Sequence, residues 1–160
     1  ALLPIDNISV SRIPHPDVRF EVGDDIKVII KSFDDNGRAT LTHKELLGTW
    51  EENAEKFHIG ETVSGIIRSV ESYGIFVELT PNLAGLAEYT PGVFDGQQTS
   101  VYIKSIIPEK MKIKLVIIDA YDFTPDLKHP SYFIDTDNIK HLDYWRYSPA
   151  NCKKLVETIF

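Results

Sequence analysis

The chain has 160 residues, of which 42% are hydrophobic, enough for one or two small domains with a buried core. Its formal net charge of −7 excludes a generally basic protein that coats nucleic-acid phosphates through bulk charge, but leaves room for a local cationic groove. No apolar run is long enough to cross a membrane, and a lone cysteine, Cys152, excludes an internal disulfide, so we expect a protein of the reducing cytoplasm.

The first 47 residues predict two strands that are joined by a tight turn. Valines and isoleucines in residues 20–30 predict the first strand, and residues 38–41 predict the second. Between them, Asp34-Asp-Asn36-Gly37 contains the Asn-Gly pair that favours a hairpin turn.

A short helix is expected between this hairpin and the rest of the chain. Thr49 and Glu52 have the spacing of a capping box, as do Thr42 and Glu45, and we expect the helix to end near Phe57. Trp50, at the start of this helix, is interpreted as a packing anchor between two units and not as a stacking ring.

Residues 60–79 predict two strands that meet at Tyr73 and Gly74. Ile75 and Val77 alternate along the second strand and supply its inner face, which leaves Tyr73 and Phe76 for an outer surface. Exposed rings on a small β-barrel form a stacking platform for single-stranded nucleic acid. The alternative is that the two rings plug the barrel or pack between domains.

The last forty or so residues, 119–160, have a mixed pattern. Pro125 and Pro130 interrupt the tail, and Tyr144-Trp-Arg-Tyr147 predicts a short strand whose rings either pack the tail or stack bases. Ser148-Pro149 has the pattern of a helix start, so residues 151–160 are expected to form a helix. We expect this tail to cover an open sheet edge in residues 20–47.

Residues 58–118 resemble the S-one RNA-binding domain, the repeat of the largest small-subunit ribosomal protein. The resemblance rests on Gly60-Glu61, on Tyr73-Gly-Ile-Phe76-Val, on Gly85-Leu86 and on a later strand pair in which Lys112 precedes Ile-x-Leu. It implies a mainly β protein with a five-stranded OB barrel of the S-one type.

The same resemblance divides the chain into three parts. Residues 1–57 resemble the C-terminal half of a preceding repeat plus a linker helix, residues 58–118 form the complete OB domain, and residues 119–160 form a mixed α/β extension. The first two strands of the earlier repeat are absent, so we expect the chain to be a segment of a longer multi-repeat protein.

In this family, RNA contacts come from two aromatic residues, a histidine, an aspartate and a basic residue. Glu88 stands in the place of the histidine and Ile107 in that of the aspartate, and both changes weaken the inherited site. Arg68 and Lys104 are expected to face outward beside the rings as phosphate contacts. The predicted RNA-binding residues are Tyr73, Phe76, Arg68, Lys104, Lys112 and, from the partial repeat, Arg38.

The function that follows is binding of single-stranded RNA, mRNA in particular, near the ribosome as part of a ribosomal-protein-like translation factor. No nucleophile motif and no glycine-rich phosphate loop after a strand is present, so we expect no catalysis, cofactor or metal. The alternative, favoured by the net charge and by Glu88 and Ile107, is a protein-interaction module that has kept the fold and lost RNA binding. A catalytic domain elsewhere in a longer protein would leave the RNA-binding role intact.

Overall fold

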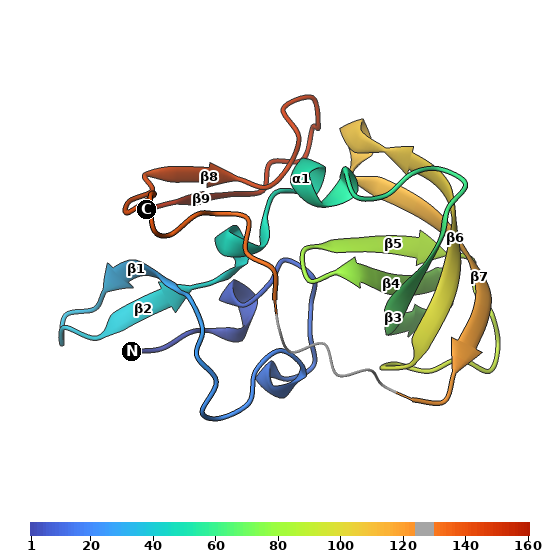
Figure 1. The fold of residues 1–160 in the computed structure, drawn as a ribbon, viewed down its shortest axis with the longest axis horizontal. Helices are drawn as coiled ribbons and strands as arrows, with labels where there is room; N and C mark the ends of the chain where they lie inside the picture. The colour runs from blue at the N-terminus through green and yellow to red at the C-terminus, as the bar shows by residue number, and fades with distance from the viewer. Residues whose placement is uncertain (124–129) are drawn as a thin grey trace.

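A closed five-stranded barrel dominates the computed structural model, which describes residues 1–123 and 130–160 (Figure 1). The barrel strands are β3 (Thr62–Glu71), β4 (Gly74–Thr80), β5 (Leu83–Ala87), β6 (Gln98–Ile107) and β7 (Lys112–Tyr121). They follow the order β3-β4-β5-β7-β6, and every pair is antiparallel except β5 and β7. The predicted mainly β class and five-stranded barrel are therefore confirmed.

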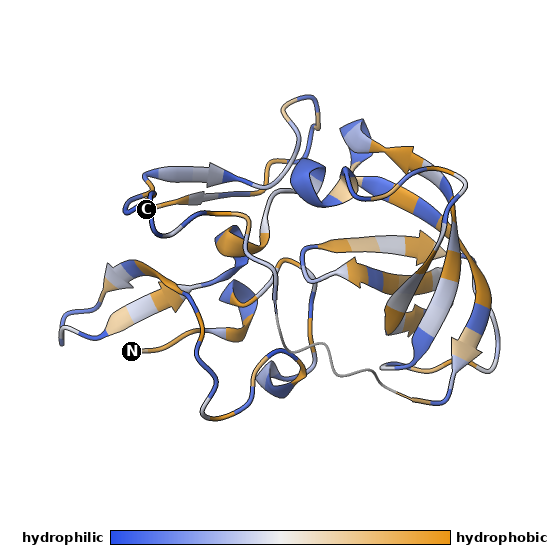
Figure 2. Cartoon of the chain, viewed as in Figure 1, coloured by the Kyte–Doolittle hydropathy of each residue, from blue (hydrophilic) through white to orange (hydrophobic). Residues whose placement is uncertain are grey.

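Alternating side chains fill the barrel, because every second residue of a strand points to the same face. Ile75 and Val77 of β4 are fully buried, as predicted, together with residues of the other four strands. Figure 2 shows the resulting alternation of apolar and polar residues along the barrel strands. Gly85 permits the close approach of β5 to β7, since a Cβ atom there would lie 2.6 Å from Leu115 Cδ1.

The N-terminal region contains η1 (Ile5–Asn7), η2 (Pro16–Val18) and a hairpin of β1 (Ile29–Phe33) and β2 (Ala39–Thr42). The predicted turn is confirmed, with Gly37 at a φ of 79°. The predicted strand over residues 20–28 is wrong. Gly23 adopts a φ of 99° in a turn that the Asp24 carboxylate closes by accepting the Glu21 N–H, so the chain becomes a strand only at Ile29.

Helix α1 (Trp50–Ala54) begins at the predicted capping box and ends earlier than expected. The Glu52 N–H donates to Thr49 Oγ1, and the Thr49 N–H donates to the Glu52 carboxylate. Trp50 is buried in the same hydrophobic core as the barrel residues, as its interpretation as an anchor requires. Thr42 forms no second capping box: its hydroxyl donates to the Glu45 side chain, and η3 (Lys44–Leu47) follows.

The C-terminal region is a small hairpin of β8 (Tyr144–Arg146) and β9 (Glu157–Ile159). The short strand is confirmed, but the predicted helix over residues 151–160 is wrong. Ser148 accepts the Val156 N–H, and the Tyr147 N–H donates to the Val156 carbonyl, so the chain turns back into a strand pair. Pro125 lies outside the described residues.

The tail contacts the segment that follows β2. The Phe133 N–H donates to the Leu46 carbonyl, and the Thr158 hydroxyl donates to the Glu45 carboxylate. Figure 1 shows the β8–β9 hairpin on the same side of the barrel as β1–β2. No tail strand extends the β1–β2 sheet within residues 1–123 and 130–160. In the same residues, no helix has the length and apolar character to cross a bilayer.

Candidate nucleic-acid interface

Tyr73 and Phe76 lie beside each other on the outside of the barrel. Tyr73 occupies the turn between β3 and β4, and 69% of its surface is exposed. Phe76 points outward from β4, since Ile75 and Val77 fill the core. The two rings meet edge to face, with centroids 6.2 Å apart and planes at 81°. This contact holds Phe76 in place and leaves most of the Tyr73 ring free.

A groove of about 590 Å³ runs from these rings across β5 and β7. Phe76 is the register partner of Leu86 on β5, and Leu86 is the partner of Lys114 on β7, so the three side chains form a row across neighbouring strands. The lining residues are Tyr73, Phe76, Ala84, Gly85, Leu86, Ala87, Glu88, Lys104, Met111, Lys112, Ile113, Lys114, Leu115 and Val116. Ten of these lining residues are uncharged and mostly apolar, and the other four carry charge.

The charge of the groove is opposite to that of the chain. Three exposed lysines, Lys104, Lys112 and Lys114, line it against one exposed acid, Glu88, so its formal charge is +2 while the chain carries −7. A local cationic groove in an acidic chain is what a ligand with negative charge requires. Glu88 lies where it weakens that attraction.

Four of the six predicted site residues meet in this groove, namely Tyr73, Phe76, Lys104 and Lys112. Sequence reasoning missed Lys114 and Leu86. A signal for Lys114 was present, because Lys112-x-Lys114 follows the period of two that puts both side chains on one face of a strand. Leu86 was recognised only as part of the Gly-Leu motif.

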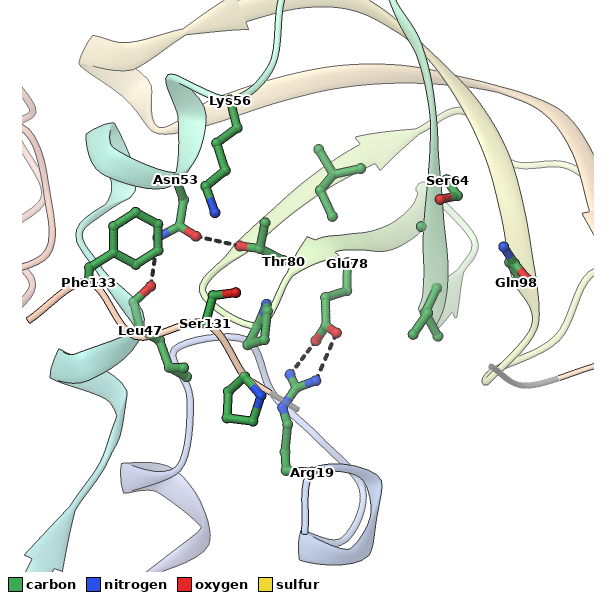
Figure 3. Close-up of a pocket in the computed structure, with 15 residues that line it drawn as sticks. Arg19, Leu47, Asn53, Lys56, Ser64, Glu78, Thr80, Gln98, Ser131 and Phe133 are labelled. Atoms are coloured by element: carbon green, nitrogen blue, oxygen red, sulfur yellow. Dashed lines mark hydrogen bonds and ion pairs between the residues drawn. The ribbon is translucent and has the colours of Figure 1, made fainter. Parts of the chain in front are cut away.

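Arg68 is not an exposed side chain beside the rings, and that expectation is wrong. Its side chain is only 10% exposed, and its Nε and Nη2 atoms lie 3.3 and 3.2 Å from the Glu78 carboxylate oxygens. Arg19 binds the same carboxylate from the N-terminal region (Figure 3). Burial alone would raise the pKa of Glu78, but the two guanidinium groups outweigh it and hold that pKa below its usual value.

Arg38 also lies away from the groove. It is exposed at the turn between β1 and β2, where its N–H donates to Asp34 Oδ1 at 2.8 Å. This hairpin is a separate sheet from the barrel, and Arg38 does not line the groove. The six predicted residues therefore do not form one surface.

The aromatic cluster in the tail packs the chain instead of forming a second platform. Trp145 and Tyr147 are buried, with ring centroids 5.9 Å apart, and the Tyr147 hydroxyl donates to the Asn82 carbonyl. Burial raises the pKa of Tyr147. Tyr144 is exposed, but its hydroxyl is bound 2.6 Å from Glu157 Oε2. In the described part of the chain, no three His, Cys, Asp or Glu side chains gather as a metal site would need.

No family model matches this chain. A region of 129 residues is 32% identical to small ribosomal subunit protein bS1 of Staphylococcus aureus, covering 72% of this chain and 33% of the relative. A region of 121 residues is 33% identical to the 4-hydroxy-3-methylbut-2-enyl diphosphate reductase of Clostridium tetani, covering 74% of this chain and 19% of the reductase. A solved structure of an uncharacterized protein from Methanocaldococcus jannaschii is also similar, with 23% identity, a TM-score of 0.35, and coverage of 37% of this chain and 89% of the other.

The chain thus spans about a third of the bS1 relatives that it matches and a still smaller part of the reductase. The similarity to bS1 suggests an S1-like OB domain, and the closed five-stranded barrel agrees with that.

Proposed function

We propose that this chain binds single-stranded RNA in the groove beside Tyr73. Bases stack on Tyr73 and Phe76, and phosphates contact Lys104, Lys112 and Lys114. The observation that carries the proposal is the meeting of two outward rings and three lysines in one groove on a closed barrel. Stacking of one base on an aromatic ring contributes about 1–3 kcal/mol, and it is tolerant of sequence because every base has a π-face.

The charge distribution supports weak, salt-sensitive binding. The groove offers three cations, and the rest of the chain is acidic, so phosphates are attracted at this place and repelled elsewhere. For a single strand, each neutralised phosphate contributes about −0.7 to the slope of log affinity against log salt. We expect a slope of about −2 for the three lysines together.

The finer role of the module is a further part of the proposal. The relative named bS1 is a ribosomal protein, which supports a place for this chain in a ribosomal-protein-like translation factor that binds mRNA in the cytoplasm. Similarity also extends to 19% of a protein named as a reductase, which supports a module that recurs within different longer proteins. We propose that the module itself has no catalytic activity and no cofactor.

We also propose that residues 1–57 are the C-terminal half of a preceding barrel, followed by the OB domain over 58–118 and an extension over 119–160. Strand pairing supports this division. Leu2 forms a parallel bridge with Thr40 beside the β1–β2 hairpin, just as β5 runs parallel to β7 beside the β6–β7 hairpin. Both hairpins carry a β-bulge. Ile30 of β1 is 57% exposed, as expected for the inner face of an open half-barrel.

A protein-interaction module is the second candidate. Leu86 and Tyr73 are exposed apolar groups at the groove, and Glu88 weakens the attraction for phosphate. An apolar patch with mixed charges at its rim suits a protein partner. The two candidate functions differ in whether a short RNA binds to the groove at low salt.

Fluorescence anisotropy with a labelled single-stranded RNA of about a dozen nucleotides tests the proposal, since an OB fold occupies about 4–16 nucleotides. We expect binding that weakens with salt, and a loss of at least about 30-fold in Tyr73→Ala/Phe76→Ala. A matched control is Tyr89→Ala/Phe94→Ala, which removes an exposed tyrosine and phenylalanine outside the groove. Absence of binding at low salt by a folded protein, or equal loss in both double variants, would overturn RNA recognition by the groove.

A further inference from the structure

A second cavity, of about 350 Å³, lies on another part of the barrel surface (Figure 3). Its walls come from β3, β4 and the start of β6 in the barrel, and from Arg19, the end of η3, the end of α1 and the segment from Pro130 to Phe133. None of the groove residues lines this cavity. The two sites are separate.

One wall of the cavity contains a buried cluster of charged side chains. The side chains of Arg19, Arg68 and Glu78 are 5%, 10% and 4% exposed, and the two guanidinium groups share the one carboxylate, with Arg19 and Glu78 lining the cavity and Arg68 behind them. Buried charges in proteins are paired, because an unpaired one is costly to remove from water. In addition, Arg19 Nε is buried without a hydrogen-bond partner in the described part of the protein. The shared carboxylate and the unpaired Nε make this wall of the cavity suited to an anionic ligand.

A further cation stands at the wall of the cavity. Lys56, just after α1, places its Nζ atom 4.5 Å from the centre of the Phe133 ring, and forms no salt bridge with the described residues. Figure 3 shows its side chain extending beside that ring. The side chains of Ser64, Gln98 and Ser131 also line the cavity and form no hydrogen bonds with the described residues, so their donors are available to a ligand.

We propose that this cavity binds a phosphate monoester of nucleotide size. Arg19 and Lys56 line the cavity against one acid, Glu78, so the lining has a formal charge of +1 that a phosphate matches, and a phosphate accepts several hydrogen bonds at once. The cavity is at the lower end of the range for small-molecule sites, about 300–1,000 Å³, so it has room for an organic group as well. Leu47, Leu79 and Phe133 give that group an apolar wall.

Two sources have this chemistry: a free nucleotide and the 5′ end of an RNA strand. Glu78 and Phe76 point from the same face of β4, two residues apart, which corresponds to about 7 Å along a strand. An RNA strand whose bases stack in the groove therefore has one end within reach of the cavity. The free-nucleotide source does not depend on the proposed RNA binding, and only the second source rests on it.

Isothermal titration calorimetry with AMP, and with adenosine as the matched ligand without phosphate, tests the first source. We expect AMP to bind at least about tenfold more tightly than adenosine, because charge-assisted hydrogen bonds are lost with the phosphate. Lys56→Ala should remove most of that difference. Lys110→Ala, which removes an exposed lysine outside both sites, should leave AMP binding unchanged.

Anisotropy with RNA that carries either a 5′-phosphate or a 5′-hydroxyl tests the second source. A preference for the 5′-phosphate that disappears in Lys56→Ala supports the RNA end as ligand. AMP binding without such a preference supports the free nucleotide. If a folded protein shows neither the AMP preference nor the 5′-phosphate preference, or if Lys56→Ala changes neither, the phosphate site is overturned whether or not the groove binds RNA.

Discussion

Arg19 and Glu78 form a buried bidentate ion pair that ties the N-terminal region to the barrel. Arg19 Nη1 lies 2.8 Å from Glu78 Oε2, and Arg19 Nη2 binds the other carboxylate oxygen. The residues are 59 positions apart in sequence, and both side chains are about 95% buried. Because Arg68 binds the same carboxylate, Glu78 is the centre of the contact between β3, β4 and the segment before β1.

Glu78→Gln should therefore destabilise the protein strongly. The substitution leaves two buried guanidinium groups without a charged partner, and breaking a buried pair in this way costs about 3–5 kcal/mol. Urea unfolding near neutral pH measures the change in the free energy of unfolding. Glu109→Gln, an exposed acid in η4 (Pro108–Lys110), should change it by less than about 0.5 kcal/mol. Equal effects of the two substitutions would contradict this role of Glu78.

The Glu78 carboxylate also makes the free energy of unfolding depend on pH in the acidic range. The folded-state pKa of Glu78 is below the ordinary 4.5, so its contribution is fully present above that pH. It is lost as the pH falls through the lower folded pKa. Unfolding free energies between neutral pH and about pH 3 should fall less in Glu78→Gln than in the wild type, measured against the same Glu109→Gln control.

His43 predicts a second pH dependence, nearer to neutral. Its ring is 1% exposed. The Nδ1 atom lies 2.7 Å from the Ile8 carbonyl oxygen, and the Nε2 atom lies 3.1 Å from the Tyr132 hydroxyl oxygen. The same hydroxyl also accepts a hydrogen bond from the Lys27 N–H. A neutral ring that donates from Nδ1 and accepts at Nε2 satisfies every group, whereas protonation leaves the Tyr132 hydroxyl without an acceptor. Burial lowers the pKa of His43 below 6.5, although the Ile8 carbonyl opposes the shift.

Stability should therefore fall as the pH decreases below 6.5, because the unfolded chain then binds a proton that the folded His43 does not. The loss continues down to the folded pKa. Chemical unfolding across this range measures it. His43→Gln should remove the dependence, whereas His141→Gln, at an exposed site, should retain it. A flat wild-type profile between pH 6.5 and about pH 5 would contradict the buried neutral histidine.

Lys114→Ala should reduce the salt dependence of RNA binding. If Lys114 neutralises one phosphate of a single strand, its loss lowers the slope of log affinity against log salt by about 0.7. Anisotropy titrations at several salt concentrations measure this slope. Lys153→Ala, an exposed lysine of the tail outside the groove, should leave the slope unchanged. An unchanged slope in Lys114→Ala would remove this lysine from the phosphate path.

Glu88→Gln should strengthen RNA binding. Glu88 is the one acid among the groove residues, and its exposed carboxylate repels phosphates across water with an energy on the order of 1 kcal/mol at close range. We expect a gain of a few-fold at low salt that shrinks at high salt because of screening. Glu55→Gln, an exposed acid at the end of α1, is the matched control. A protein-binding groove without RNA would show no gain.

Local sequence patterns were sufficient to predict that Tyr73 and Phe76 lie outside the barrel core, whereas the five-stranded barrel was predicted from the family resemblance. The period-two alternation of Ile75 and Val77 places Phe76 outside, and a turn at Tyr73 exposes its ring, because side-chain direction along a strand depends only on position. The capping box at Thr49 and the Asn36-Gly37 turn were likewise predictable, since each depends on residues three or fewer positions apart.

Contacts between residues far apart in the sequence determined the features that were predicted wrongly. Arg68 was expected to be exposed, but it is buried, because Glu78 is shared with an arginine 59 residues away. Residues 157–159 pair with β8 instead of forming a helix, and Thr158 reaches a carboxylate 113 residues earlier in the chain. A sequence fixes which side chains alternate and where a turn is favoured, whereas the burial of a charge and the choice between a weak helix and a strand pair depend on partners that only folding brings together.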